Sequence, residues 1–102
     1  MCIADISKEH CNQVFMDLEA QGKKAIFIEA DFSKSESPVR VVEEFTNILG
    51  KLDILVNNVG IQSPASYKNV EETTEDMWDA VINVNLKSYF LISKYSIPPM
   101  KN

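Results

Sequence analysis

Asn57, Asn58 and Gly60 follow a short segment in which four of five residues are apolar, and their types suit a ligand-binding edge. That segment, Leu-Asp-Ile-Leu-Val at residues 52–56, has the length and character of a buried strand. Asn and Gly should end it in a turn, because both tolerate left-handed and turn conformations. In an open parallel α/β sheet, ligands bind outside the carboxyl ends of the strands. Backbone and amide groups would therefore lie where a cofactor binds, although an ordinary strand-ending turn contains the same residue types.

Two aspartates end the two earlier apolar segments and could bind parts of a dinucleotide. Asp5 follows Cys-Ile-Ala, and an acidic residue at such a strand end accepts hydrogen bonds from adenosine ribose hydroxyls. Its charge would repel a 2′-phosphate and so favours NAD over NADP. Asp31 could accept a hydrogen bond from the adenine amino group. Both have a structural alternative, because Asp5 precedes the expected helix cap Ser7 and Asp31 lies where a helix dipole favours a carboxylate.

Asn85 is a further candidate, a carboxamide inside the most apolar helix that the sequence predicts. An amide costs free energy in such a place unless its hydrogen bonds are made. Asn83 adds a second residue of modest helix propensity. Two interpretations stay open: a structural side chain that bonds to backbone, or a polar anchor for a proton relay.

Alternating strands and helices must position these residues. The apolar pattern predicts three strands, at residues 2–5, 24–30 and 52–56. It predicts three helices between and after them, at residues 7–21, about 37–49 and about 74–95. The expected caps and stops are Ser7, Gly22, Gly50, Thr73 or Thr74, Pro98 and Pro99. A loop should join the last strand to the last helix, from residue 61 to about 72. Short connections and right-handed crossovers make this order an α/β fold with a parallel, Rossmann-like sheet and flanking helices.

Each helix carries apolar residues that can cover the sheet. The stripe of the first helix is Cys11, Val14, Phe15 and Leu18. The stripe of the second is Val41, Val42, Phe45, Ile48 and Leu49. The last helix is apolar nearly all round, which indicates one side on the sheet and another against a second subunit.

Length and composition limit the possible functions. The 102 residues suffice for one small domain, and 45% hydrophobic with 25% charged residues is typical of a soluble globular protein. A net charge of -5 without a Lys/Arg cluster argues against nucleic-acid or anionic-membrane binding. Cys2 and Cys11 are expected to be reduced thiols of a cytoplasmic protein, and His10 has no partner at metal-ligand spacing. The sequence contains no apolar run of about 18 residues, so we expect no transmembrane helix.

Four segments together resemble the short-chain dehydrogenase/reductase family in order and spacing. They are Ala-Asp-Ile-Ser, Glu-Ala-Asp-Phe-Ser, Gly-Lys-Leu-Asp-Ile-Leu-Val-Asn-Asn-Val-Gly and Trp-Asp-Ala-Val-Ile-Asn-Val-Asn-Leu-Lys-Ser-Tyr-Phe. Residues 1–102 then form part of a dinucleotide-binding domain, closest in look to NAD-dependent alcohol or sugar dehydrogenases. The resemblance implies hydride transfer between NAD(H) and an alcohol or carbonyl substrate, with NADP less favoured. It also implies a homotetramer or homodimer formed through the 74–95 helix.

The family pattern transfers to individual positions. It implies a cofactor-binding set of Asp5, Ile6, Asp31, Phe32, Asn58, Val59 and Gly60. Asp5 matches the ribose-binding acid and Asp31 the aspartate that contacts adenine. Asn85 matches the family's catalytic asparagine, whose carbonyl region holds a water linked to an active-site lysine. Val59 stands where the family usually has alanine.

Two parts of the family's chemistry are missing from the sequence. No Gly-x-x-x-Gly-x-Gly loop is present to cradle a pyrophosphate, and no Tyr-x-x-x-Lys is present to serve as general acid/base. The resemblance therefore implies an incomplete fold that lacks the first βα unit and the C-terminal half. The strand expected between 2–5 and 52–56 is then absent, and unpaired strand edges promote aggregation. We expect the isolated chain to be marginally stable and inactive.

Two other interpretations compete with an active oxidoreductase. The chain could be a catalytically dead remnant of the family that acts as a binding or interaction piece through its last helix. A flavodoxin-like or receiver-type α/β domain is less favoured, because it would not explain Asn-Asn-Val-Gly together with Asn85.

Overall fold

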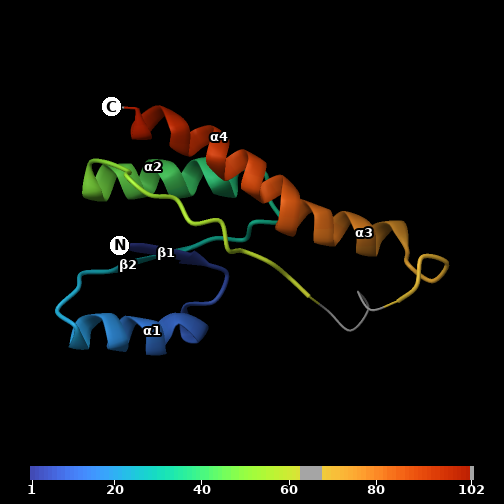
Figure 1. Ribbon diagram of the computed structural model, residues 1–102, viewed down its shortest axis with the longest axis horizontal. Coiled ribbons are helices and arrows are strands. Elements are labelled where there is room, and N and C mark those ends of the chain that lie inside the picture. Colours follow the sequence, from blue (N-terminus) through green and yellow to red (C-terminus); the bar gives the residue numbers. More distant parts are fainter. Residues whose placement is uncertain (63–67, 102) are drawn as a thin grey trace.

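A small parallel sheet lies between layers of helix in the computed structural model, which describes residues 1–62 and 68–101 (Figure 1). Strands β1 (Cys2–Asp5) and β2 (Ile26–Glu29) pair in parallel, so that Asp5 lies opposite Glu29. The helix α1 (Lys8–Ala20) connects them. The predicted parallel α/β arrangement is confirmed for these elements.

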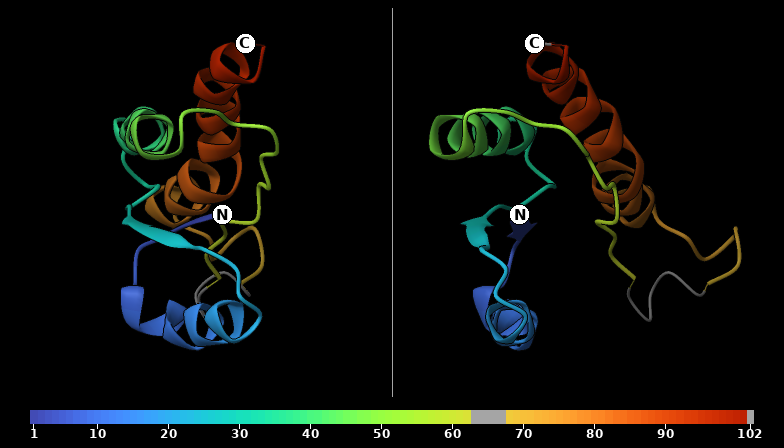
Figure 2. Two further views of the ribbon diagram at one scale, coloured as in Figure 1. Left: turned by 90° about the vertical axis from the view of Figure 1, so that its left-hand side faces the viewer. Right: turned by 60° about the vertical axis from the view of Figure 1, so that its left-hand side comes forward.

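Helix α1 covers one face of the sheet (Figure 2). Its start is fixed by Ser7, whose side chain accepts a hydrogen bond from the His10 amide, and Gly22 follows its end with a φ of 71°. The Phe15 ring meets that of Phe27 in β2 edge to face, with centroids 6.2 Å apart. Val14, expected in the buried stripe, is instead 47% exposed.

Helix α2 (Ser37–Leu49) covers the other face of the sheet (Figure 2). Pro38 occupies its first turn and Gly50 ends it with a φ of 78°. Its buried residues join β2 and the last helix in one core, formed by Ile28, Ala30, Phe32, Val41, Val42 and Ile92. Ile48 and Leu49 are exposed, contrary to the predicted stripe. A helix of 13 residues spans about 20 Å and a four-residue strand about 13 Å, so the end of α2 extends past the sheet.

The third strand, predicted at 52–56, is not formed. Within the two described ranges, no backbone–backbone hydrogen bond joins residues 51–62 to any other segment. Ile54 and Val56 are 78% and 77% exposed. The prediction failed because an apolar run becomes a strand only beside a hydrogen-bonded neighbour. The backbone there stays extended without one.

The last helix is longer than predicted and changes its winding. It consists of α3 (Glu75–Ile82), the π-helical stretch η2 (Asn83–Lys87) and α4 (Ser88–Met100). Thr74 caps it, accepting a hydrogen bond from the Met77 amide.

The predicted end near Tyr95 is wrong, because the helix continues through Pro98 and Pro99. The fixed φ of proline, about −65°, is compatible with a helix, although each proline lacks an N–H donor. The Lys101 amide closes the final turn on the carbonyls of Ile97 and Pro98.

Helix α4 packs against α2 (Figure 1). The buried residues of the last helix are spaced by four: Val84 in η2, and Ser88, Ile92 and Ser96 in α4. The large apolar residues elsewhere on it are exposed, namely Trp78, Leu86, Phe90 and Ile97. One face of the last helix is therefore buried within this chain, and the expected contact of another face with a second subunit stays a prediction. None of the helices in the described ranges is long and apolar enough to cross a membrane.

Candidate functional site

Side chains of the last helix form hydrogen bonds with backbone and side-chain groups of the extended segment 57–61. The Tyr89 hydroxyl donates to the Val59 carbonyl at 2.7 Å. Asn57 Nδ2 donates to Ser93 Oγ at 3.3 Å. Together with Asn85, these contacts form what we call the helix ladder, defined by Asn85, Tyr89 and Ser93.

The ladder works because two periodicities match. Residues four apart on a helix are about 6.0 Å apart along its axis, and residues two apart on an extended chain are about 6.6 Å apart. Ser93 meets residue 57, Tyr89 meets residue 59 and Asn85 meets residue 61. The segment therefore runs antiparallel to the helix and presents alternate residues to it.

Asn85 makes two hydrogen bonds of the ladder. Its Oδ1 accepts from the Ile61 amide at 2.7 Å, and its Nδ2 donates to the Ile61 carbonyl at 3.0 Å. One amide side chain therefore satisfies both backbone groups of Ile61, which lies in no strand of the described residues. Of the two open interpretations, the bond to backbone is observed.

The π-helical winding around Asn85 has its own hydrogen bonds. The Ser88 amide donates to the Asn83 carbonyl, five residues earlier. The Val84 carbonyl would take that amide in an α-helix, and it accepts from the Ser88 hydroxyl instead. Ser88 is 2% exposed, so its hydroxyl needs this partner. The two asparagines of low helix propensity were the sequence signal for a change of winding.

Gly60 lies against the Asn85 amide. A Cβ at Gly60 would be 3.6 Å from Asn85 Oδ1, which is ordinary van der Waals contact. Among the described residues only Gly22 and Gly50 have positive φ, so Asn57, Asn58 and Gly60 make no left-handed turn. The expected turn is replaced by extended backbone.

Asp5 stands at the end of β1 with one carboxylate oxygen engaged. Its Oδ1 accepts from the Ser7 amide at 2.9 Å, and its backbone carbonyl accepts from Ala30. Oδ2 has no protein partner within residues 1–62 and 68–101. The neighbouring Ile6 is 63% exposed. The end of β1 thus offers a carboxylate oxygen beside an exposed apolar side chain.

Asp31 follows β2 and is held ionised. Its Oδ1 accepts from Ser33 Oγ at 2.6 Å and from the Ser33 amide at 3.0 Å. These bonds, the hydroxyl first, lower the pKa of the Asp31 carboxyl below its ordinary value of 3.8. Phe32 is 9% exposed and belongs to the core.

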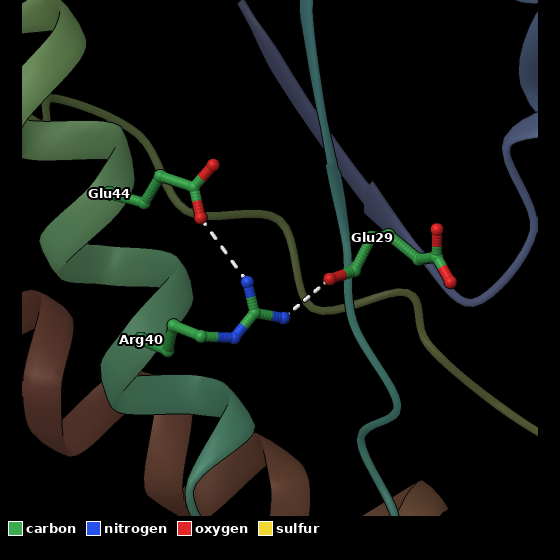
Figure 3. A network of polar contacts seen from close by, with 3 residues as sticks. All are labelled: Glu29, Arg40 and Glu44. Carbon is green, nitrogen blue, oxygen red and sulfur yellow. Dashed lines mark hydrogen bonds and ion pairs between the residues drawn. The ribbon is translucent and has the colours of Figure 1, made fainter.

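Arg40 of α2 secures the strand end that precedes Asp31 (Figure 3). Its guanidinium donates to the Glu29 carbonyl through Nη2 and pairs with Glu44 Oε2 through Nη1 at 3.2 Å. The backbone carbonyl at the end of β2 therefore has a charged donor.

The structure groups the expected site residues in two places. Asp5 ends β1 and Asp31 comes two residues after the end of β2, so both lie at the carboxyl ends of the two parallel strands. Asn58, Val59, Gly60 and Asn85 lie where segment 57–61 crosses the helix. Sequence reasoning missed Tyr89 and Ser93, which their spacing of four from Asn85 could have revealed. The described part of the chain contains no cluster of three His, Cys, Asp or Glu residues suited to a metal ion.

Comparison with known proteins identifies the fold and the family. The family model "short chain dehydrogenase" matches residues 1–102. The chain belongs to the short-chain dehydrogenase family. An uncharacterized oxidoreductase of Thermotoga maritima is 39% identical over 101 residues, which are 99% of this chain and 38% of that protein.

Two further relatives extend the comparison. A 3-oxoacyl-acyl-carrier-protein reductase of Thermotoga maritima is 36% identical over 94% of this chain and 38% of its own length. A short-chain dehydrogenase structure from Burkholderia cenocepacia J2315 in complex with NADP superposes with a TM-score of 0.86. It is 31% identical and matches 97% of this chain and 40% of that one. The chain thus spans 38% of the length of these curated relatives.

Proposed function

We propose that this chain is part of an oxidoreductase that transfers hydride between NAD(H) and an alcohol or carbonyl substrate. Residues 1–102 would contribute part of its dinucleotide-binding domain. The observation that carries the proposal is the double hydrogen bond between Asn85 and Ile61, which fixes segment 57–61 beside the helix. A polar segment that side-chain hydrogen bonds hold in one position suits the wall of a cofactor cleft.

The residues present fit the adenosine half of such a cofactor. The unpartnered Oδ2 of Asp5 would accept from a ribose hydroxyl, with Ile6 packing beside it. Asp31, held ionised, would accept from the adenine amino group, with the backbone of Phe32 adjacent. Asn58, Val59 and Gly60 would line the cofactor cleft. The bound nicotinamide would supply the hydride acceptor or donor.

Asn85 would act through its backbone, because its side chain is occupied by Ile61. In this proposal its carbonyl region anchors a water of the proton relay. The tyrosine and lysine that would complete the relay are not in the sequence, so we propose that the isolated chain is inactive. Measurable NADH turnover by the 102-residue chain with secondary alcohols or sugars would overturn this part.

Cofactor preference provides the test of the Asp5 assignment. We propose NAD over NADP, because an Asp5 carboxylate repels a 2′-phosphate, although the Burkholderia cenocepacia relative holds NADP. Titration calorimetry with both dinucleotides should show tighter NAD binding. Asp5→Asn keeps the oxygen that accepts from Ser7 and removes the charge, so it should reduce the preference. Glu19→Gln, exposed on α1, is the matched control. Equal binding of NAD and NADP by the wild-type chain would refute the assignment.

A second candidate function is a non-catalytic binding piece. The observation that favours it is the exposed apolar face on the last helix, formed by Trp78, Leu86 and Phe90. We propose that the protein is cytoplasmic, where the free thiols of Cys2 and Cys11 would stay reduced.

We propose that the exposed apolar face joins copies of the chain into a homodimer or homotetramer. Light scattering should show a dimer or tetramer that Phe90→Lys dissociates; a monomeric wild-type chain would contradict this.

A further inference from the structure

The contacts of the helix ladder differ in how far water reaches them. The hydrogen bonds that Asn85 and Ser93 make with segment 57–61 lie in exposed surroundings. The hydrogen bond from the Tyr89 hydroxyl to the Val59 carbonyl is partly buried, and its length is 2.7 Å. A hydrogen bond is electrostatically stronger where water is excluded. Water therefore competes least with the Tyr89 contact, which holds the middle of segment 57–61.

Val59 is held in two ways, by packing and by this hydrogen bond. Its side chain packs against the core cluster that contains Phe32 and Ile92. Apolar packing is non-directional, so it keeps the side chain in place without fixing the rotation of the peptide group. A hydrogen bond has a preferred geometry at the carbonyl oxygen. The Tyr89 hydroxyl therefore fixes the orientation of the peptide group between Val59 and Gly60.

Fixing the Val59 carbonyl determines where the neighbouring backbone groups point. In an extended chain, alternate residues direct their N–H and C=O groups to opposite sides. The Val59 carbonyl points toward the last helix, and so do both backbone groups of Ile61. The backbone groups of Asn58 and Gly60 therefore point away from the helix. Both residues are exposed, and they make no backbone–backbone hydrogen bond with the described residues.

We propose that Tyr89 is a positioning residue of the cofactor cleft. It acts through the Val59 carbonyl and fixes the direction in which Asn58 and Gly60 present their backbone groups to a dinucleotide. This role rests on the proposed function, because the ligand is the nicotinamide dinucleotide proposed for this cleft. Without the hydroxyl, only a fraction of molecules would hold the peptide group in the binding orientation, and the apparent affinity falls by that fraction. Loss of one ordinary hydrogen bond corresponds to about a fivefold smaller fraction.

Titration calorimetry of NAD with the full 102-residue chain tests this role. Tyr89→Phe removes only the hydroxyl and should weaken NAD binding by about fivefold. The matched control is Thr74→Ala, which removes the cap at the start of the same helix and should cause a similar loss of stability. The lost hydrogen bond of this control is to the Met77 amide and not to segment 57–61. Thr74→Ala should therefore leave NAD binding unchanged.

NMR of the backbone carbonyl carbons separates positioning from a general loss of stability. The carbonyl resonance of Val59 responds to the hydrogen bond that this carbonyl accepts. Tyr89→Phe should therefore shift that resonance in the chain without NAD, whereas Thr74→Ala should leave it in place. A residue that only stabilised the fold would give the same resonance in both variants.

The possible outcomes distinguish this role from the proposed function. Equal NAD affinity of Tyr89→Phe and the wild-type chain would overturn the role of Tyr89 and leave the proposed function standing. Equal weakening by Tyr89→Phe and Thr74→Ala, or an unshifted Val59 carbonyl resonance in Tyr89→Phe, would also overturn the positioning role. Absence of NAD binding by the wild-type chain would overturn the proposed function, and the role of Tyr89 with it.

Discussion

Replacing Asn85 by Asp tests the contact that fixes segment 57–61. The substitution retains an oxygen that accepts from the Ile61 amide and removes the Nδ2 donor to the Ile61 carbonyl, now at 3.0 Å. At neutral pH a carboxylate oxygen would face that carbonyl oxygen. The lost hydrogen bond costs about 1 kcal/mol, and the repulsion adds a similar amount. Ile61 is 45% exposed, so water limits the total to about 1–2 kcal/mol.

The loss should depend on pH with a definite sign. A protonated carboxyl has one O–H donor and one acceptor, and therefore reproduces both bonds of the Asn85 amide. The folded state favours this neutral form, so the pKa of the introduced group should lie about one unit above the unfolded value near 3.9. The variant should match the wild-type chain below about pH 4 and show its full deficit above about pH 5.

Urea denaturation followed by circular dichroism, from pH 3.5 to 7.5, measures this effect. The quantity is the difference in free energy of unfolding between Asn85→Asp and the wild-type chain at each pH. Asn12→Asp, which adds the same charge at an exposed position of α1, should show no such pH-dependent deficit. A deficit that is constant across this range, or absent at pH 7, would refute the pairing of Asn85 with Ile61.

Three other substitutions test neighbouring contacts. Tyr89→Phe removes the hydroxyl bond to segment 57–61 and should lower the free energy of unfolding by about 1 kcal/mol in urea denaturation; an unchanged value contradicts the ladder. Ser33→Ala removes the principal cause of the lowered Asp31 pKa, so NMR titration should show that pKa rising toward 3.8. The free energy of unfolding should fall only above about pH 4, because a carboxyl with a lowered pKa stabilises the fold only where it is ionised in the unfolded chain too. Arg40→Met should lower the free energy of unfolding by about 1 kcal/mol, equally at 0.1 and 1 M NaCl. The reason is that the hydrogen bond to the Glu29 carbonyl contributes more than the exposed ion pair with Glu44. A loss that vanishes at high salt would show that the ion pair contributes more.

Helix boundaries could be predicted because their signals are local. Ser7 and Thr74 cap their helices by bonding amides three residues ahead, and Gly22 and Gly50 take the left-handed conformation after helix ends. The end of α4 escaped prediction, since prolines at its last turn remove donors without forbidding helical φ.

The strand at 52–56 could not be judged from its own residues. An apolar run indicates that a segment can be buried. A strand also needs a neighbouring segment that forms hydrogen bonds with its backbone groups. The same limit applied to the candidate site. The sequence indicated that Asn85 needs hydrogen-bond partners, but only the geometry selects Ile61, 24 residues earlier in the chain. Tyr89 was missed because its ring fits an apolar helix pattern and its hydroxyl contact is non-local.

The contrast between the two halves of segment 52–61 explains what the helix ladder does. Where the ladder reaches, the backbone groups of Val59 and Ile61 have side-chain partners and the chain is fixed without a neighbouring strand. Where it stops, residues 52–56 make no backbone–backbone hydrogen bond with the described residues, and Ile54 is exposed. The ladder therefore replaces strand pairing at one end only.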